Sequence, residues 1–322
     1  MPISKLAILD DYQGVTLSHP AWAALPHVQT AVFRDTIADQ DALVARLAPF
    51  DAILAMRERT PFNAALINRL PNLRLLMTTG ERNRGIDAAA CAARGITFCG
   101  TSSFGAPTVE ITWGLILSLM RGLPEQMASL RAGSWQGLTV FGDVGRTVEG
   151  KTLGVVGLGK LGARVAKVGQ AFGMKVIAWS QNLTDEAAAK VGATRVDKAT
   201  LMAESDVITL HLILSDRSRG IIGADDLSRM KPDAVIVNTS RGPLIDQDAL
   251  LAALHAKRIG GAGLDVFDIE PLPPTHPILS APRTVLTPHL GYVSAENYAA
   301  YFTGAVEAIQ AFEAGAPIRV IT

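Results

Sequence analysis

The sequence has few cysteines, few aromatic residues and no excess of charge of either sign. It has two cysteines in 322 residues, 6% aromatic residues, and 30 acidic against 30 basic residues, so its formal net charge is zero. Two cysteines without C-x-x-C spacing give neither a disulfide framework nor a metal site, and we expect Cys91 and Cys99 to be reduced core residues. A balanced charge offers no general attraction to nucleic acid or to a membrane surface, so neither is expected as a partner.

Long apolar runs are also absent. The strongest run, ITWGLILSLM at residues 111–120, is about half as long as the roughly 20 residues that a membrane-spanning helix needs. The N-terminal stretch MPISKLAILDD has no signal-peptide pattern. We therefore expect a soluble, cytoplasmic protein, and the 48% apolar content is enough to fill more than one core.

Strand-like and helix-like patterns alternate along the chain. The strand-like runs are KLAILD, DAILAM, LRLLMTTG and GITFCG in the first hundred residues, and TLGVVG, MKVIAW, DVITLHL, DAVIVNTS, GAGLDVF and TVLTP from residue 152 onward. The helix-like segments lie near residues 40–48, 63–69, 87–93, 161–172 and 247–258, with two long helices predicted at about 106–121 and 294–314. This alternation predicts an α/β fold with two Rossmann-like or flavodoxin-like parallel-sheet domains and a cleft between them.

A glycine motif follows the first strand of the second group. The run GVVGLGKLG gives Gly157, Gly159 and Gly162 the G-x-G-x-x-G spacing, after a predicted strand and at the start of a predicted helix. These glycines allow a tight turn, a close approach to a pyrophosphate and close helix packing, so we predict a dinucleotide site that includes Lys160 and Leu161. The buried face of the helix is expected to be Leu161, Val165, Val168 and Phe172.

The end of the next predicted strand lacks an acidic residue. An aspartate or glutamate usually binds the adenosine ribose of NAD there, and Ser180 in VIAWSQN matches the position. Ser180 does not repel a 2′-phosphate, and no arginine follows it directly to neutralise one. We predict NAD as the cofactor, with NADP not excluded.

Three polar residues follow three later strands. Arg241 follows VIVNTS, Glu270 follows GLDVF, and His289 follows VLT. Arginine can grip a carboxylate, histidine can exchange a proton, and glutamate can favour the charged imidazole, which together suit hydride chemistry on a 2-oxo acid. Taken singly, these residues could instead be a surface cation, a solvated loop acid and a strand-end cap. His211 in ITLHLIL could border the cofactor cleft, and a structural role is the alternative.

With these motifs the sequence resembles the D-isomer-specific 2-hydroxyacid dehydrogenases, a group that includes phosphoglycerate, glycerate and D-lactate dehydrogenases. GVVGLGKLG, NTSRG, GLDVFDIEPLP and TPHLG occur in the family's order and approximate spacing. The resemblance implies that Arg241 binds substrate, that His289 is the acid/base and that Glu270 is its partner. It also implies that Asp265 contacts the nicotinamide carboxamide and that Thr108 lies near the cofactor.

The resemblance further implies a discontinuous architecture. Residues 1–100 and 290–322 would form a substrate domain, and residues 101–289 would form the dinucleotide-binding domain. A homodimer through the cofactor domain is expected, without the additional regulatory domain of some phosphoglycerate dehydrogenases.

The predicted substrate loop departs from the family pattern. It reads GERNRGID, and Gly80, Glu81 and Arg82 are expected to contact the substrate. Arginines in this loop and in MRERT could bind a second anionic group such as a phosphate, or they could be solvated and paired with neighbouring glutamates. The substrate is therefore left open among 3-phosphoglycerate, glycerate or hydroxypyruvate, and glyoxylate.

A second class of function fits the same motifs. A dinucleotide-sensing binding protein, similar to the corepressors of this fold, could keep all three polar residues. The lack of a basic or low-complexity extension favours the enzyme.

Overall fold

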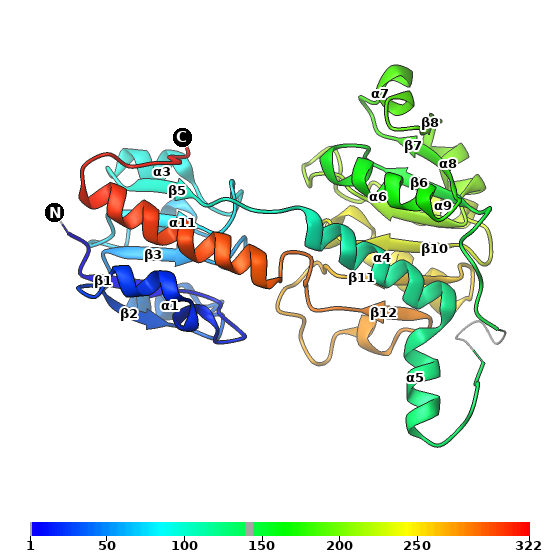
Figure 1. The fold of residues 1–322 in the computed structure, drawn as a ribbon, viewed down its shortest axis with the longest axis horizontal. Helices are drawn as coiled ribbons and strands as arrows, with labels where there is room; N and C mark the ends of the chain where they lie inside the picture. The colour runs from blue at the N-terminus through cyan, green and yellow to red at the C-terminus, as the bar shows by residue number, and fades with distance from the viewer. Residues whose placement is uncertain (1, 139–143) are drawn as a thin grey trace. The chain divides into compact units, whose positions relative to one another are not determined.

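The computed structural model describes residues 2–138 and 144–322, and the chain divides into two compact units (Figure 1). The first unit comprises Met1–Phe104 and Val293–Thr322, and the second comprises Gly105–Tyr292. Each unit contains one parallel sheet with helices on both faces. In the part of the chain that the structure describes, no helix is long and apolar enough to cross a membrane.

The first unit is built on a five-stranded sheet of order β2-β1-β3-β4-β5. Its strands are β1 (Lys5–Ile8), β2 (Gln29–Val32), β3 (Ala52–Ala55), β4 (Leu75–Thr78) and β5 (Thr97–Gly100). One face packs against α1 (Gln40–Leu47), α2 (Ala64–Ile67) and α3 (Ala88–Ala93). The C-terminal helix α11 (Ala295–Glu313) covers the other face, which joins the end of the chain to the fold of its beginning (Figure 1).

The second unit is built on a seven-stranded sheet of order β12-β11-β10-β9-β6-β7-β8. Its strands are β6 (Thr152–Val156), β7 (Lys175–Trp179), β8 (Thr194–Arg195), β9 (Val207–Leu210), β10 (Val235–Asn238), β11 (Gly261–Leu264) and β12 (Thr284–Leu286). One face packs against α4 (Ala106–Arg121) and α6 (Lys160–Ala171), and the other against α8 (Lys198–Glu204), α9 (Ala224–Arg229) and α10 (Gln247–His255). The remaining helices are α5 (Leu123–Arg131) and α7 (Asp185–Ala189).

The strand order identifies where each sheet can bind a ligand. All paired strands are parallel, so within each sheet their carboxyl ends lie at one edge. The order reverses at β6, which lies between β9 and β7, and in the other sheet at β1, which lies between β2 and β3. Crevices at such reversals are the usual ligand sites of open parallel sheets.

The predicted fold class is confirmed, and two details differ from the sequence-based expectation. The edge strands β2 and β8 were not predicted, because neither carries a buried apolar run. The buried face of α6 consists of Gly162, Val165, Ala166 and Gly169, whereas Phe172 is 40% exposed. The small residues allow the helix to lie close to the sheet, with Val165 buried as predicted and Leu161 and Val168 partly buried against the same cluster. Cys91 and Cys99 are free and buried, as predicted.

Candidate active site

The three polar residues predicted for hydride chemistry lie beyond three neighbouring strands of the second unit. Arg241 follows β10, Glu270 follows β11 and His289 follows β12, and these strands are adjacent in the sheet. Because the strands are parallel, the loops that carry the residues leave the same edge. Strand order therefore brings together side chains that are up to 48 positions apart in the sequence.

Glu270 and His289 are in direct contact. Glu270 Oε2 lies 2.6 Å from His289 Nδ1, and both side chains are about one-fifth exposed. Glu270 Oε1 accepts a hydrogen bond of 2.8 Å from the backbone N–H of Phe267, so the carboxylate is fixed at both oxygens. This contact orients the imidazole and leaves Nε2 as the ring nitrogen that can exchange a proton with a substrate.

The loop that carries His289 is organised by a buried carboxylate. Asp265 Oδ1 accepts hydrogen bonds from the Thr287 hydroxyl at 2.6 Å and from the Leu290 N–H at 2.7 Å, and Oδ2 accepts one from the Gly291 N–H at 2.7 Å. Burial raises the pKa of the Asp265 carboxyl above its usual value, and the hydrogen bonds oppose this increase. Both carboxylate oxygens of Asp265 are thus used to hold this loop. The expected contact of Asp265 with a nicotinamide stays a prediction.

Two further contacts define the surroundings of the imidazole. The ring of Tyr292 lies edge-on to that of His289, with centroids 5.5 Å apart and an interplanar angle of 71°. The hydroxyl of Thr108 donates to the Gly291 carbonyl at 2.6 Å, so this residue of α4 also holds the loop. His289 itself has a left-handed backbone, with φ of 52°, which is uncommon for a residue with a side chain.

Arg241 is held at the start of its loop by its neighbours. Its Nη1 donates to the Ser240 carbonyl at 2.6 Å, and its own carbonyl accepts from Asn238 Nδ2 at 2.8 Å. The next residue is Gly242, where a Cβ would overlap the backbone of Phe267 and Asp268. The loops that carry Arg241 and Glu270 are therefore in backbone contact, which only glycine permits.

The glycine motif has the shape that a pyrophosphate needs. Gly157 has φ of 99°, and a Cβ there would lie 2.8 Å from the His211 carbonyl group. A Cβ at Gly162 would overlap the carbonyl oxygen of Gly157, whereas one at Gly159 would meet no atom within 4 Å. Thus Gly157 and Gly162 make the turn compact, while open space beside Gly159 faces the N-terminus of α6, which begins with Lys160 and Leu161.

His211 borders the same turn. Its Nε2 is paired with the Thr209 hydroxyl at 3.0 Å, and its buried Nδ1 has no hydrogen-bond partner within the described ranges. Burial lowers the pKa of His211 to about 4, so the ring is neutral at neutral pH. An unpaired polar atom beside the glycine turn fits a bound dinucleotide, which could supply the partner.

The surroundings of Ser180 are close to neutral. Ser180 follows β7, and the nearby Lys198 lies with its Nζ 5.9 Å from the centre of the Trp179 ring. Lys198 Nζ is already bonded to Asp226 Oδ2 and to the Ile221 carbonyl, each at 2.9 Å. This cation is therefore committed to the fold and is not available to neutralise a 2′-phosphate.

The residues of the predicted substrate loop lie in the first unit, at the carboxyl edge of its sheet. Gly80, Glu81 and Arg82 directly follow Thr79 at the end of β4, and Glu81 and Arg82 are exposed. Arg57 follows β3 with φ of 53°, and its Nη1 donates to the Thr79 carbonyl at 3.1 Å. A Cβ at Gly80 would overlap the Arg57 guanidinium, so glycine is required for this guanidinium to lie over the turn.

Over residues 2–138 and 144–322, no group of three or more histidine, cysteine, aspartate or glutamate side chains could hold an ion.

Comparison with known proteins identifies the class. The model of the D-isomer specific 2-hydroxyacid dehydrogenase, NAD binding domain, matches residues 113–291, which is more than half of the chain. The chain therefore belongs to the D-isomer-specific 2-hydroxyacid dehydrogenase family. It is an NAD-dependent oxidoreductase of 2-hydroxy acids, as the resemblance implied.

Particular relatives cover most of its length. It is 36% identical over 255 residues to the glyoxylate reductase of Aeropyrum pernix, covering 78% of this chain and 76% of that protein. It is 35% identical over 276 residues to the glycerate dehydrogenase of Methylorubrum extorquens, covering 84% and 85%. Among solved structures, phosphoglycerate oxidoreductase from Vibrio cholerae matches with a TM-score of 0.92 and 40% identity, over 97% of this chain and 100% of that one.

Two contributions to the site were not found by sequence reasoning. The role of Asp265 as the acceptor for its own loop was missed, although a lone aspartate within the apolar run GLDVF is a signal that a buried carboxylate needs several donors. The sequence carries no signal for the packing of Tyr292 against His289, because this contact depends on the turn between the two residues.

We predict that Asp265→Asn disorders the His289 loop. The asparagine oxygen can still accept from Thr287 and Leu290, but its NH₂ group would face the Gly291 N–H, leaving a buried donor unpaired at a cost of about 1–3 kcal/mol. The turnover number for 2-oxo acid reduction should fall at least about tenfold, since that cost is borne by the catalytic loop. Steady-state kinetics and thermal unfolding measure both effects, with Asp225→Asn on the exposed side of α9 as the control. Turnover equal to the parent's would show that the carboxylate is not needed to hold the loop.

Proposed function

We propose that Arg241, Glu270 and His289 carry out the interconversion of a small 2-oxo acid and its D-2-hydroxy acid. The observation that carries this proposal is the 2.6 Å contact between Glu270 and His289 beyond adjacent parallel strands. A carboxylate that touches one ring nitrogen supports the charged form of the imidazole, which can then donate a proton from the other nitrogen.

In this proposal each residue has one task. NADH, which Gly157, Gly159 and Gly162 would hold, would supply a hydride for the carbonyl carbon. His289 gives the proton that reaches the carbonyl oxygen, so one hydroxyl group replaces the carbonyl and the charges balance. Arg241 holds the substrate carboxylate through its planar guanidinium. In the oxidation direction neutral His289 takes the hydroxyl proton.

We propose that the first unit is the substrate domain and that the second unit is the dinucleotide-binding domain. The family match on residues 113–291 and the shape of the glycine turn support the second assignment. Gly80, Glu81 and Arg82 are proposed to contact substrate from the first unit. Relatives named glyoxylate reductase, glycerate dehydrogenase and hydroxypyruvate reductase support glyoxylate, hydroxypyruvate or glycerate as the substrate.

A second anionic group on the substrate is the alternative within the same proposal. The half-buried Arg57 guanidinium is fixed over Gly80, and its Nη1 donates to the Thr79 carbonyl. Such a cation suits a phosphate or a second carboxylate. Relatives named D-3-phosphoglycerate dehydrogenase agree with a phosphorylated substrate, although the chain spans about half the length of those proteins.

A dinucleotide-sensing binding protein would differ from the proposed enzyme because it would not turn over a substrate. A panel of 2-oxo acids that includes glyoxylate, hydroxypyruvate and 3-phosphohydroxypyruvate should reveal reduction by NADH. Tight dinucleotide binding without turnover of any of them would favour the sensor. We also propose a cytoplasmic location, which the two buried free thiols support.

We predict that His289→Ala lowers the turnover number for reduction by about two to four orders of magnitude, because it removes the proton donor. Reduction by the parent should decline as pH rises, since protonated imidazole is the reactive form. Glu270→Gln keeps the shape but removes the charge, so the decline should begin at a lower pH. Oxidation at high pH needs neutral imidazole and should be affected less.

The measurement is the pH profile of turnover in both directions. His255→Ala, on the exposed end of α10, is the matched control and should give the parent's profile. If the profiles of Glu270→Gln and the parent coincide, the proposed pairing is wrong.

For the cofactor, we predict that NADPH also supports reduction, because Ser180 neither repels nor neutralises a 2′-phosphate. The two specificity constants should differ by less than about a thousandfold, or ~4 kcal/mol. Ser180→Asp should shift the preference toward NADH by like-charge repulsion, and Ser228→Asp on α9 is the control. An unchanged preference in Ser180→Asp would place the 2′-phosphate away from this residue.

We also propose a homodimer formed through the second unit. The supporting feature is a set of exposed apolar side chains on and after α5, which we call the α5 patch: Leu123, Met127, Leu130, Trp135, Leu138 and Val144, each 43–79% exposed. Exposed apolar clusters of this kind mark interaction surfaces, and a second copy of the chain is the partner expected from the family.

We predict that Met127→Glu with Leu130→Glu converts the dimer to a monomer, because two charges would be buried in an apolar contact. Sedimentation velocity measures the state, with Leu17→Glu, an exposed leucine of the first unit, as the control. A double variant that sediments like the parent would exclude the α5 patch as the interface.

A further inference from the structure

The loop that carries Glu270 has a second carboxylate–imidazole contact at its base. Asp268 precedes Glu270 by two positions, and its Oδ1 lies 3.4 Å from Nε2 of His276. The His276 side chain is 6% exposed and that of Asp268 is 37% exposed, so the pair reaches from the interior to the surface. The segment between the two residues contains Glu270.

His276 is anchored to the core of the second unit. Its Nδ1 accepts a hydrogen bond of 3.3 Å from the Ile278 N–H, so Nε2 is the ring nitrogen left to face Asp268. The His276 N–H donates to the Pro273 carbonyl at 3.0 Å, and Ile278 is buried in the apolar cluster under the sheet. His276 is thus fixed by its backbone and by Nδ1, while its Nε2 lies 3.4 Å from Asp268 Oδ1.

Asp268 stands where the two catalytic loops meet. Its neighbour Phe267 gives the N–H that holds Glu270 Oε1, and its own backbone nitrogen packs against Gly242, next to Arg241. A displacement of Asp268 therefore moves the backbone donor of Glu270.

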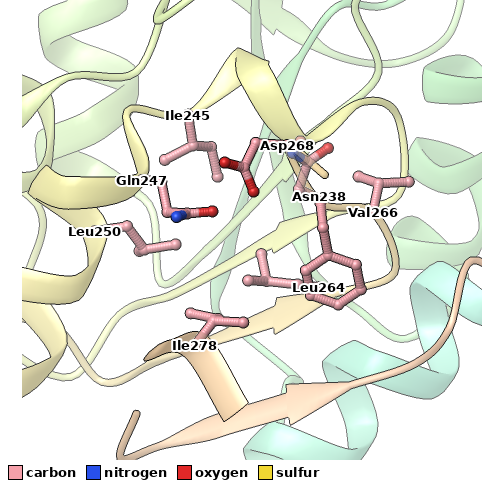
Figure 2. Close-up of a pocket in the computed structure, with 10 residues that line it drawn as sticks. Asn238, Ile245, Gln247, Leu250, Leu264, Val266, Asp268 and Ile278 are labelled. Atoms are coloured by element: carbon pink, nitrogen blue, oxygen red, sulfur yellow. The ribbon is translucent and has the colours of Figure 1, made fainter. Parts of the chain in front are cut away.

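Packing alone does not fix this junction. A cavity of about 20 Å³, room for roughly one water molecule, lies beneath it. Figure 2 shows the carboxylate of Asp268 at this cavity beside Asn238 and Gln247. Because side chains do not fill this space, a polar contact must supply the constraint that packing supplies elsewhere.

We propose that Asp268 and His276 are positioning residues that hold Glu270 against His289. The inference rests on the proposed acid/base role of His289. The titratable groups that face His289 in the described residues are Glu270, Asp265 and Tyr292, and the one that faces His276 is Asp268. Neither Asp268 nor His276 is proposed to touch substrate, so their effect passes through Glu270.

The test begins with Asp268→Ala, whose side chain is exposed enough for the fold to persist. The turnover number for 2-oxo acid reduction should fall about ten- to a hundredfold, the scale of a small misplacement of a catalytic group. The KM for NADH should stay within about twofold, because the glycine turn is untouched. The pH at which reduction declines should move lower, in the direction of Glu270→Gln. Asp268→Asn should recover most of the turnover, since its carboxamide oxygen still accepts from His276 Nε2.

A second variant and a double variant separate positioning from a general structural effect. His276→Leu introduces an apolar side chain of similar size and removes both the contact with Asp268 and the acceptor of the Ile278 N–H, so it should lower turnover at least as much as Asp268→Ala. Adding Asp268→Ala to Glu270→Gln should lower turnover by less than about twofold, because the charge through which Asp268 acts is already gone. Asp248→Ala, an exposed acid on α10, is the matched control.

The outcomes distinguish this inference from the proposed function. If His289→Ala retains turnover, the acid/base assignment is wrong. If His289→Ala loses turnover while Asp268→Ala and His276→Leu keep the parent's pH profile, only the positioning role is overturned. A full, multiplicative loss in the Glu270→Gln background would also overturn it.

Discussion

The geometry of the proposed active site depends on the carboxylate of Asp265. It is fully buried, follows β11 directly, and accepts three hydrogen bonds from the Thr287–Gly291 turn, which places His289 beside Glu270. A buried charge without donors would cost several kcal/mol, so the turn and the carboxylate require each other. The left-handed backbone of His289 is stable in this setting because the residues on both sides of it are held. The fold thus contributes to the role of His289 more by positioning its side chain than by changing its intrinsic reactivity.

Strand order supplies the other constraint. Adjacent parallel strands β10, β11 and β12 deliver Arg241, Glu270 and His289 to one edge of the sheet, while the reversal at β6 leaves the crevice beside Gly157 and His211. Glycine is needed where two of these loops meet, since Gly242 lies against Phe267 and Asp268. The same unit therefore has a turn shaped for a dinucleotide and an acid/base pair at a single edge, which is the arrangement that hydride transfer requires.

The fold and the placement of Arg241, Glu270 and His289 beyond neighbouring strands could be predicted from the sequence because both depend on local signals. Apolar runs, the spacing of Gly157, Gly159 and Gly162, and polar residues at strand ends are visible in one dimension. The predicted face of α6 was right for Val165 and partly right for Leu161 and Val168, but wrong for Phe172, because Gly162 and Gly169 let the backbone approach the sheet. The strand β2 was missed because its side chains are only partly buried. The contacts of Asp265 and Tyr292 depend on the path of a turn, which periodicity does not encode.

Both units use a buried aspartate just beyond a strand to hold neighbouring loops. In the first unit, Asp11 accepts the N–H groups of Gly14, Val15 and Thr16, and Asp10 accepts the hydroxyls of Thr36 and Thr60 from the loops after β2 and β3. Burial raises the pKa of the Asp10 carboxyl, as it does for Asp265. Apolar packing can fix the strands, but it cannot specify the path of loops that must remain polar at a ligand-binding edge. Buried carboxylates whose oxygens all accept hydrogen bonds determine the path of these loops, because each alternative path would leave a buried charge with fewer hydrogen bonds.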